Sequence, residues 1–99
     1  RLLTTEWVLL ELADALCSIK QRRSATALIE FIRQSPRFQI IGYKQTVYQN
    51  GFNLFSSRLD KDWSLTDCIS FAVMSEHGVA EALTADHHFE QAGFRAIFQ

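Results

Sequence analysis

Residues 60–74 read DKDWSLTDCISFAVM, and this stretch does most to decide the fold class of the chain. Ser64 and Asp67 fit the [ST]-x-x-[DE] pattern, in which a hydroxyl and a first-turn carboxylate satisfy free backbone N–H groups. The residues that follow are good helix formers, and Gly78 is a natural terminator beyond them. The stretch therefore predicts a helix over residues 64–77 that begins with a carboxylate.

Shorter elements are predicted after this helix. Residues 82–84 are expected to form a short buried strand, residues 87–92 a helical turn, and residues 94–98 a last strand. Asp86 lies between the first strand and the turn, at a position where aspartate is a favoured helix N-cap.

Two helices are predicted at the start of the chain. Residues 4–20, TTEWVLLELADALCSIK, are nearly all good helix formers, and Thr4 or Thr5 is placed to cap the first turn. This segment is apolar almost all round, so we expect it to be deeply buried. Residues 22–34 repeat the helical period on one face only, which predicts a second, half-exposed helix.

The middle of the chain predicts one strand and one helix. Residues 38–41 are rich in β-forming side chains and therefore predict a strand. Residues 45–59 contain apolar residues at helical spacing, although Asn50-Gly51 would ordinarily signal a turn. We favour a helix there. Strands that alternate with helices imply an α/β fold with a parallel sheet flanked by helices.

Length and composition describe an ordinary globular protein. The 99 residues suffice for one domain but not for two, so we expect a single domain over residues 1–99. No apolar run approaches the ~20 residues that a membrane helix needs, and no signal-peptide pattern is present. Cys17 and Cys68 are interpreted as reduced core residues, which indicates a cytoplasmic protein. The formal net charge of -1 implies that any nucleic-acid contact is local.

Glu11 is a carboxylate in apolar surroundings. It interrupts a run of tryptophan, valine, leucine and alanine, where an ionised group is costly unless it is paired, metal-bound or facing a cleft. An equally acceptable interpretation places Glu11 on the solvent-exposed face of its helix, together with Asp14 and Ser18. Both interpretations stay open.

Asp67 and Asp86 each have a sufficient structural explanation as helix caps, yet together with Glu11 they suggest a site. In a parallel α/β fold, ligands gather outside the carboxyl ends of the strands, where Asp86 and the first turn after Ser64 are expected. Three carboxylates about 5 Å apart would repel by about 3 kcal/mol per pair at an effective dielectric near 20. Such a cluster requires a cation, and oxygen ligands indicate Mg²⁺ or Mn²⁺.

The remaining polar candidates carry weaker signals. His87 and His88 are adjacent and would diverge on a helix, so we assign both, with His77, to structure or surface. Arg58 and Lys61 flank the helix of Asp67 and are candidate phosphate contacts, although such residues are more commonly solvated.

Three segments, in this order, resemble the PIN-domain proteins of the VapC-like toxin branch. Residues 60–74 are similar to the family's central acidic helix, and residues 81–94, EALTADHHFEQAGF, resemble its C-terminal motif. Residues 4–12, TTEWVLLEL, resemble its early helix. The resemblance is most specific in the last third of the chain.

The resemblance implies a three-layer PIN-like fold and a ribonuclease of toxin–antitoxin type that uses Mg²⁺ or Mn²⁺ to hydrolyse RNA. Glu11, Asp67 and Asp86 match three of the family's four acidic metal-binding positions, and Thr84 matches a supporting hydroxyl. Ser64 is expected to support Asp67 as its cap. RNA and an antitoxin-like protein are the implied partners.

The fourth acidic position is an aspartate that ends the family's first strand. We expect that strand to be missing, because the sequence opens at Arg1 directly before the predicted helix at Thr4. The gap would leave two strand edges unpaired, so a homo-oligomer or an upstream segment is expected to cover them. A catalytically incomplete PIN-like interaction module is the alternative function.

Overall fold

The computed structural model describes residues 2–79, 81–82, 88, 91–93 and 95–96. The chain divides into two compact units, Arg1–Tyr43 and Lys44–Gln99, and each is described by itself. A single domain over the whole chain therefore stays a prediction. None of the helices in the described residues has the length and apolar character needed to cross a membrane.

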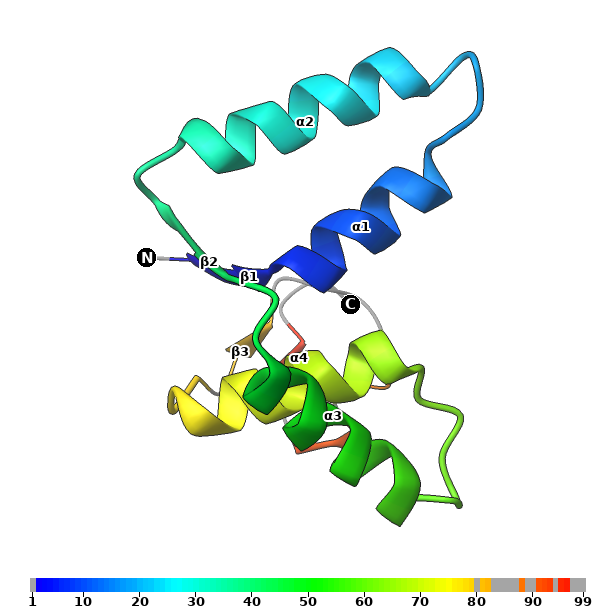
Figure 1. Cartoon of the computed structure of the whole chain (residues 1–99), viewed down its shortest axis with the longest axis vertical. Coiled ribbons are helices and arrows are strands. Elements are labelled where there is room, and N and C mark those ends of the chain that lie inside the picture. The colour runs from blue at the N-terminus through cyan, green and yellow to red at the C-terminus, as the bar shows by residue number, and fades with distance from the viewer. Residues whose placement is uncertain (1, 80, 83–87, 89–90, 94, 97–99) are drawn as a thin grey trace. The chain divides into compact units, whose positions relative to one another are not determined.

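The first unit is a parallel strand pair joined by two helices (Figure 1). Its elements are β1 (Leu2–Thr5), α1 (Glu6–Ala15), α2 (Arg22–Gln34) and β2 (Phe38–Ile41). β1 pairs in parallel with β2, and the register places Thr5 opposite Ile41. The predicted second helix and the predicted strand over residues 38–41 are confirmed.

The start of the chain differs from the prediction of one long helix over residues 4–20. Leu2–Thr5 form a strand, because β2 offers them a parallel hydrogen-bonding partner. The helix begins only after Thr5, whose Oγ1 accepts a hydrogen bond from the Val8 N–H at 3.2 Å. Thr5 is thus both the last strand residue and the N-cap. The prediction that Thr4 or Thr5 caps the helix is confirmed. β1 ends in a threonine, whereas the first strand of the resembled family ends in an aspartate, so the expected absence of that first strand stays a prediction.

The end of α1 also departs from the prediction. The helix stops at Ala15, and the Arg22 guanidinium donates two hydrogen bonds, of 3.1 and 2.9 Å, to the Cys17 carbonyl oxygen. These bonds hold the turn that leads into α2. Cys17 is therefore exposed and not a core residue. Deep burial of α1 is also wrong, since Leu9 is its single buried residue.

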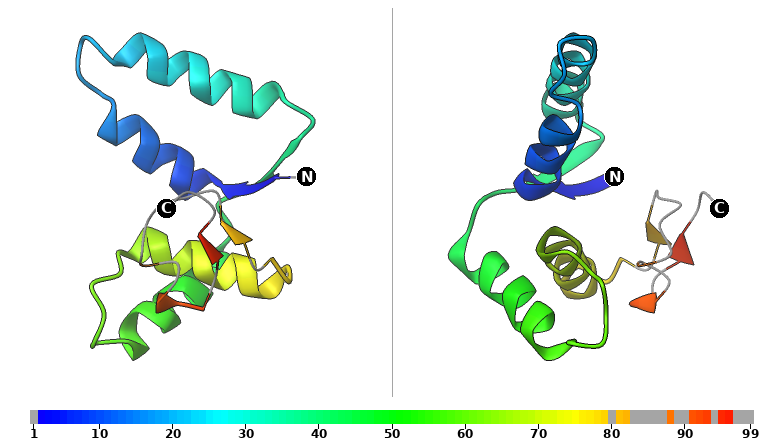
Figure 2. Two further views of the ribbon diagram at one scale, coloured as in Figure 1. Left: turned by 180° about the vertical axis from the view of Figure 1, so that it is seen from behind. Right: turned by 90° about the vertical axis from the view of Figure 1, so that its right-hand side faces the viewer.

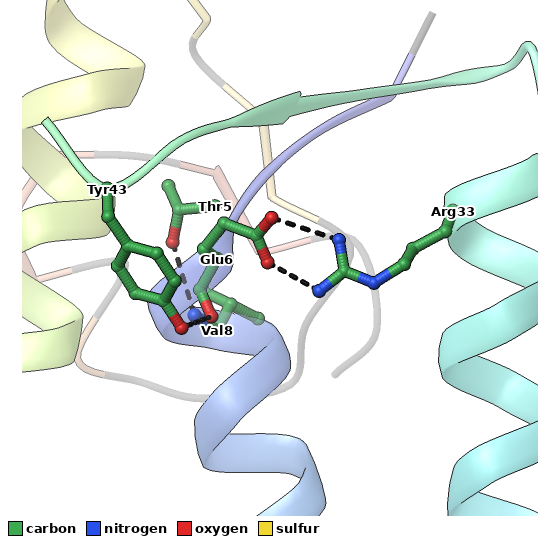
Figure 3. Close-up of polar contacts among 5 residues, drawn as sticks. All are labelled: Thr5, Glu6, Val8, Arg33 and Tyr43. Atoms are coloured by element: carbon green, nitrogen blue, oxygen red, sulfur yellow. Dashed lines mark hydrogen bonds and ion pairs between the residues drawn. The ribbon is translucent and has the colours of Figure 1, made fainter.

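An ion pair ties α1 to α2 (Figure 3). The Arg33 guanidinium donates to both carboxylate oxygens of Glu6, at 2.9 and 2.6 Å. These hydrogen bonds, and to a smaller extent the charge of Arg33, hold the pKa of Glu6 below its ordinary value. Tyr43 adds a hydrogen bond from its hydroxyl to the Glu6 carbonyl oxygen at 3.3 Å, and its ring meets Trp7 edge-on at 5.1 Å.

The second unit is built around a pair of packed helices, as Figure 2 shows from two sides. Its elements are α3 (Gln45–Ser57), α4 (Leu65–Glu76), β3 (Glu81–Ala82) and β4 (Arg95–Ala96). β3 and β4 pair in parallel. The helices over residues 45–59 and 64–77 are confirmed with shorter bounds, and Gly78, at φ 68°, terminates the second one. Of the predicted strands and the turn beyond, residues 83–84, 87, 89–90, 94 and 97–98 lie outside the described residues.

Gly51 lets α3 and α4 approach closely. A Cβ atom on this glycine would lie 2.7 Å from the Ile69 Cα and 2.9 Å from the Ile69 nitrogen, which is too close for any side chain. The Asn50-Gly51 dipeptide therefore marks a helix contact and not a turn. Next to this contact, Trp63, Cys68 and Phe71 form a buried cluster against Leu54 and Ala92.

The ion pair of the first unit predicts a pH-dependent stability. Because Arg33 lowers the pKa of Glu6 below 4.5, the stability it adds is present above that value and is lost as the pH falls through the lowered pKa. We expect Arg33→Met to lower the thermal midpoint at about pH 7 and to have a much smaller effect at about pH 3. Calorimetry measures this, with the exposed Arg23→Met on the same helix as a control. An equal loss at both pH values would contradict the assigned role.

The close contact between α3 and α4 at Gly51 predicts that alanine at this position lowers the stability of the chain, whereas alanine in place of glycine in a helix usually raises it. Gly→Ala in a helix interior ordinarily stabilises by about 0.5–1 kcal/mol. We expect Gly51→Ala to destabilise the chain by about 1–3 kcal/mol, because the backbone of Ile69 must move. Urea unfolding measures the difference, and Asn50→Ala, at an exposed position of the same helix, should be neutral or stabilising. Increased stability of Gly51→Ala would show that the helices do not meet there.

Candidate active site

Asp67 lies in the first turn of α4, where two reciprocal hydrogen bonds fix it. The Ser64 Oγ accepts from the Asp67 N–H at 3.0 Å, and the Asp67 Oδ2 accepts from the Ser64 N–H at 3.2 Å. This is the predicted capping box. A supporting role of Ser64 in a functional site stays a prediction. The negative carboxylate also complements the positive end of the helix dipole.

His88 meets the same carboxylate from the C-terminal segment. Its Nδ1 lies 3.4 Å from the Asp67 Oδ2, and the two side chains are 22% and 17% exposed. A carboxylate can only accept, so this contact is favourable when Nδ1 carries the proton. Within the described residues, both hydrogen bonds to this carboxylate fall on Oδ2, and Oδ1 accepts none.

The sequence prediction missed His88, which was assigned with the other histidines to structure or surface. His77 fits that assignment, because its Nδ1 lies 3.0 Å from the Val73 carbonyl oxygen at the end of α4. His88 instead joins a candidate site residue. Its position two residues after Asp86, in the segment resembling the PIN motif, was the available signal.

Cys68, next to Asp67, is not a nucleophile. The residue is 1% exposed, and burial raises the pKa of its thiol, with a smaller contribution from the charge of Asp67. The reactive thiolate is therefore disfavoured. Cys68 belongs to the core, as predicted from the sequence.

The other candidate carboxylates belong to the other unit or lie outside the described residues. Glu11 is exposed on α1, as is Asp14, and α1 belongs to the other unit. Asp86 and Thr84 lie outside the described residues. Within the part that is described, no three His, Cys, Asp or Glu residues are grouped closely enough to hold a metal ion. Convergence of Glu11, Asp67 and Asp86 therefore stays a prediction.

Arg58 and Lys61 gather around Trp63 in the loop between α3 and α4. The Arg58 guanidinium lies 5.2 Å, and the Lys61 ammonium 5.9 Å, from the centroid of the Trp63 ring. Trp63 itself is 5% exposed and donates from Nε1 to the Gln91 side chain at 3.0 Å. Both cations are thus held close to the start of α4 by a buried ring.

Asp60 partly neutralises this cationic pair. The Arg58 guanidinium donates two 3.0 Å hydrogen bonds to its carboxylate, which lower the pKa of Asp60 to about 2. The pair is exposed, and its main effect is to orient the Arg58 side chain.

Comparison with known proteins finds a structural neighbour. No protein-family model and no curated protein sequence matches the chain. Among solved structures, the chain is similar to Mycobacterium tuberculosis VapC20, a toxin that cleaves the sarcin-ricin loop. The two are 27% identical with a TM-score of 0.84, over 93% of this chain and 70% of that chain. The expected arrangement of parallel strands and helices is confirmed by this match.

Proposed function

Because this chain belongs to the VapC-like PIN-domain proteins, we propose that it is a ribonuclease of the toxin type. The observation that supports this most directly is the structural match to a toxin that cleaves the sarcin-ricin loop. Asp67, fixed at the helix terminus with one carboxylate oxygen unbonded in the described structure, is consistent with a role in that chemistry. The alternative of a non-catalytic interaction module has no comparable observation in its favour.

The proposed site uses Asp67 with Glu11 and Asp86 as ligands for Mg²⁺ or Mn²⁺. These ions prefer hard oxygen ligands such as carboxylates, so the Asp67 Oδ1 is a suitable ligand atom for Mg²⁺ or Mn²⁺. The ion, when bound, would supply Lewis acidity for attack of water on a phosphodiester. The chain's own contribution is to hold Asp67 in place through Ser64 before any substrate arrives. Thr84 is proposed to support Asp86.

Arg58 and Lys61 are proposed to bind backbone phosphates of the RNA. Their placement over Trp63 orients two positive charges in a chain with no net basic excess. Counterion release on phosphate binding favours such local cations. The proposed substrate is RNA, and no particular RNA is proposed as the target.

The proposed binding partners follow from the structural match to a VapC toxin. Toxins of this type imply an antitoxin-like protein partner, and we place the chain in the cytoplasm with its RNA substrate. A homo-oligomer is proposed because each two-stranded sheet in the described residues has edges that a second copy can cover.

Asp67→Asn separates the capping role from the metal-binding role. The amide oxygen of asparagine still accepts from the Ser64 N–H, so we expect the thermal midpoint to change little. Loss of the negative charge should weaken Mn²⁺ binding at least about 100-fold and abolish metal-dependent RNA cleavage. Calorimetric titration and a cleavage assay measure these effects, with the exposed Asp62→Asn as the matched control. Unchanged metal affinity, or a parallel fall in stability and affinity, would contradict the assignment.

Sedimentation tests the proposed self-association. We expect the purified chain at low micromolar concentration to sediment as a dimer or a larger species, and to dissociate on dilution by mass action. A well-folded monomer at every concentration would contradict the proposed homo-oligomer without bearing on the metal site.

A further inference from the structure

We propose that His88 is a positioning residue that turns the Asp67 carboxylate so that Oδ1 faces the metal. This inference rests on the proposed function and extends it to a residue outside the acidic set. It is carried by the contact between the His88 Nδ1 and the Asp67 Oδ2 at 3.4 Å.

The contact is selective for one oxygen of the carboxylate. Oδ2 accepts the Ser64 N–H at 3.2 Å and faces the His88 Nδ1, whereas Oδ1 accepts no hydrogen bond in the described residues. Two donors on one oxygen fix the rotation about the Cβ–Cγ bond of Asp67. Without this restraint the carboxylate plane would rock within a broad torsional well.

The capping hydrogen bond alone restrains the tilt of the carboxylate plane only loosely. A carboxylate oxygen accepts a hydrogen bond over a broad range of directions, so one backbone donor permits several tilts of the plane. The ring of His88, at 22% exposure, meets the carboxylate in addition to the cap of α4 and so limits the tilt of the carboxylate plane. Hydrogen-bonded supporting residues of this kind typically change metal affinity by about 10–100-fold when removed.

Three substitutions at this position separate an orienting hydrogen bond from simple packing. The amide nitrogen of asparagine lies at the same number of bonds from the backbone as the histidine Nδ1, whereas that of glutamine corresponds to Nε2. We expect His88→Ala and His88→Gln to weaken Mn²⁺ binding by about 10–100-fold, and His88→Asn to stay within about threefold of the unmodified chain. Titration calorimetry with Mn²⁺ alone measures the affinities, and thermal melts report folding.

His77→Asn is the matched control, because this histidine lies at the other end of α4 with its Nδ1 on a backbone carbonyl oxygen. It should leave Mn²⁺ affinity unchanged. If His88→Ala fails to fold, the comparison of the asparagine and glutamine variants decides. Equal affinities for those two variants would overturn the positioning role. Should Asp67→Asn still lose Mn²⁺ binding in that case, the proposed function would stand. Undiminished Mn²⁺ binding in Asp67→Asn would overturn both the positioning role of His88 and the proposed metal-binding role of Asp67.

Discussion

The reciprocal hydrogen bonds between Ser64 and Asp67 are the constraint on which the second unit depends. They fix the residue at which α4 begins, and so determine which side chains of that helix face α3. Trp63 immediately precedes the cap and Cys68 follows it, so the buried cluster is assembled from both sides of this turn. The same carboxylate is the proposed metal ligand. In the proposed function, folding and chemistry therefore share this one side chain.

The elements that the sequence predicted correctly are those whose cause is local. Helical periodicity determines α2, the capping box determines the start of α4, and a dense run of β-forming residues determines β2. The family resemblance also pointed to the right fold, because it rests on short segments whose order along the chain is specific.

The errors have non-local causes. Thr4 and Thr5 were assigned to a helix because good helix formers follow them, but they belong to the strand Leu2–Thr5, which comes from pairing with β2, far along the chain. Cys17 was assigned to the core by pattern, whereas the helix ends before it, at Ala15, and Cys17 is exposed. The contact of His88 with Asp67 joins two distant segments, which no local pattern could predict.

The two tryptophans give each unit its own optical probe. Trp7 lies against Tyr43 in the first unit, and Trp63 is buried in the second with its indole N–H bonded to Gln91. Because the sequence has no other tryptophan, a single Trp→Phe exchange leaves one emitter that reports on one unit. Fluorescence of two such single-tryptophan chains would thus reveal whether the units unfold together or one after the other, which bulk calorimetry averages.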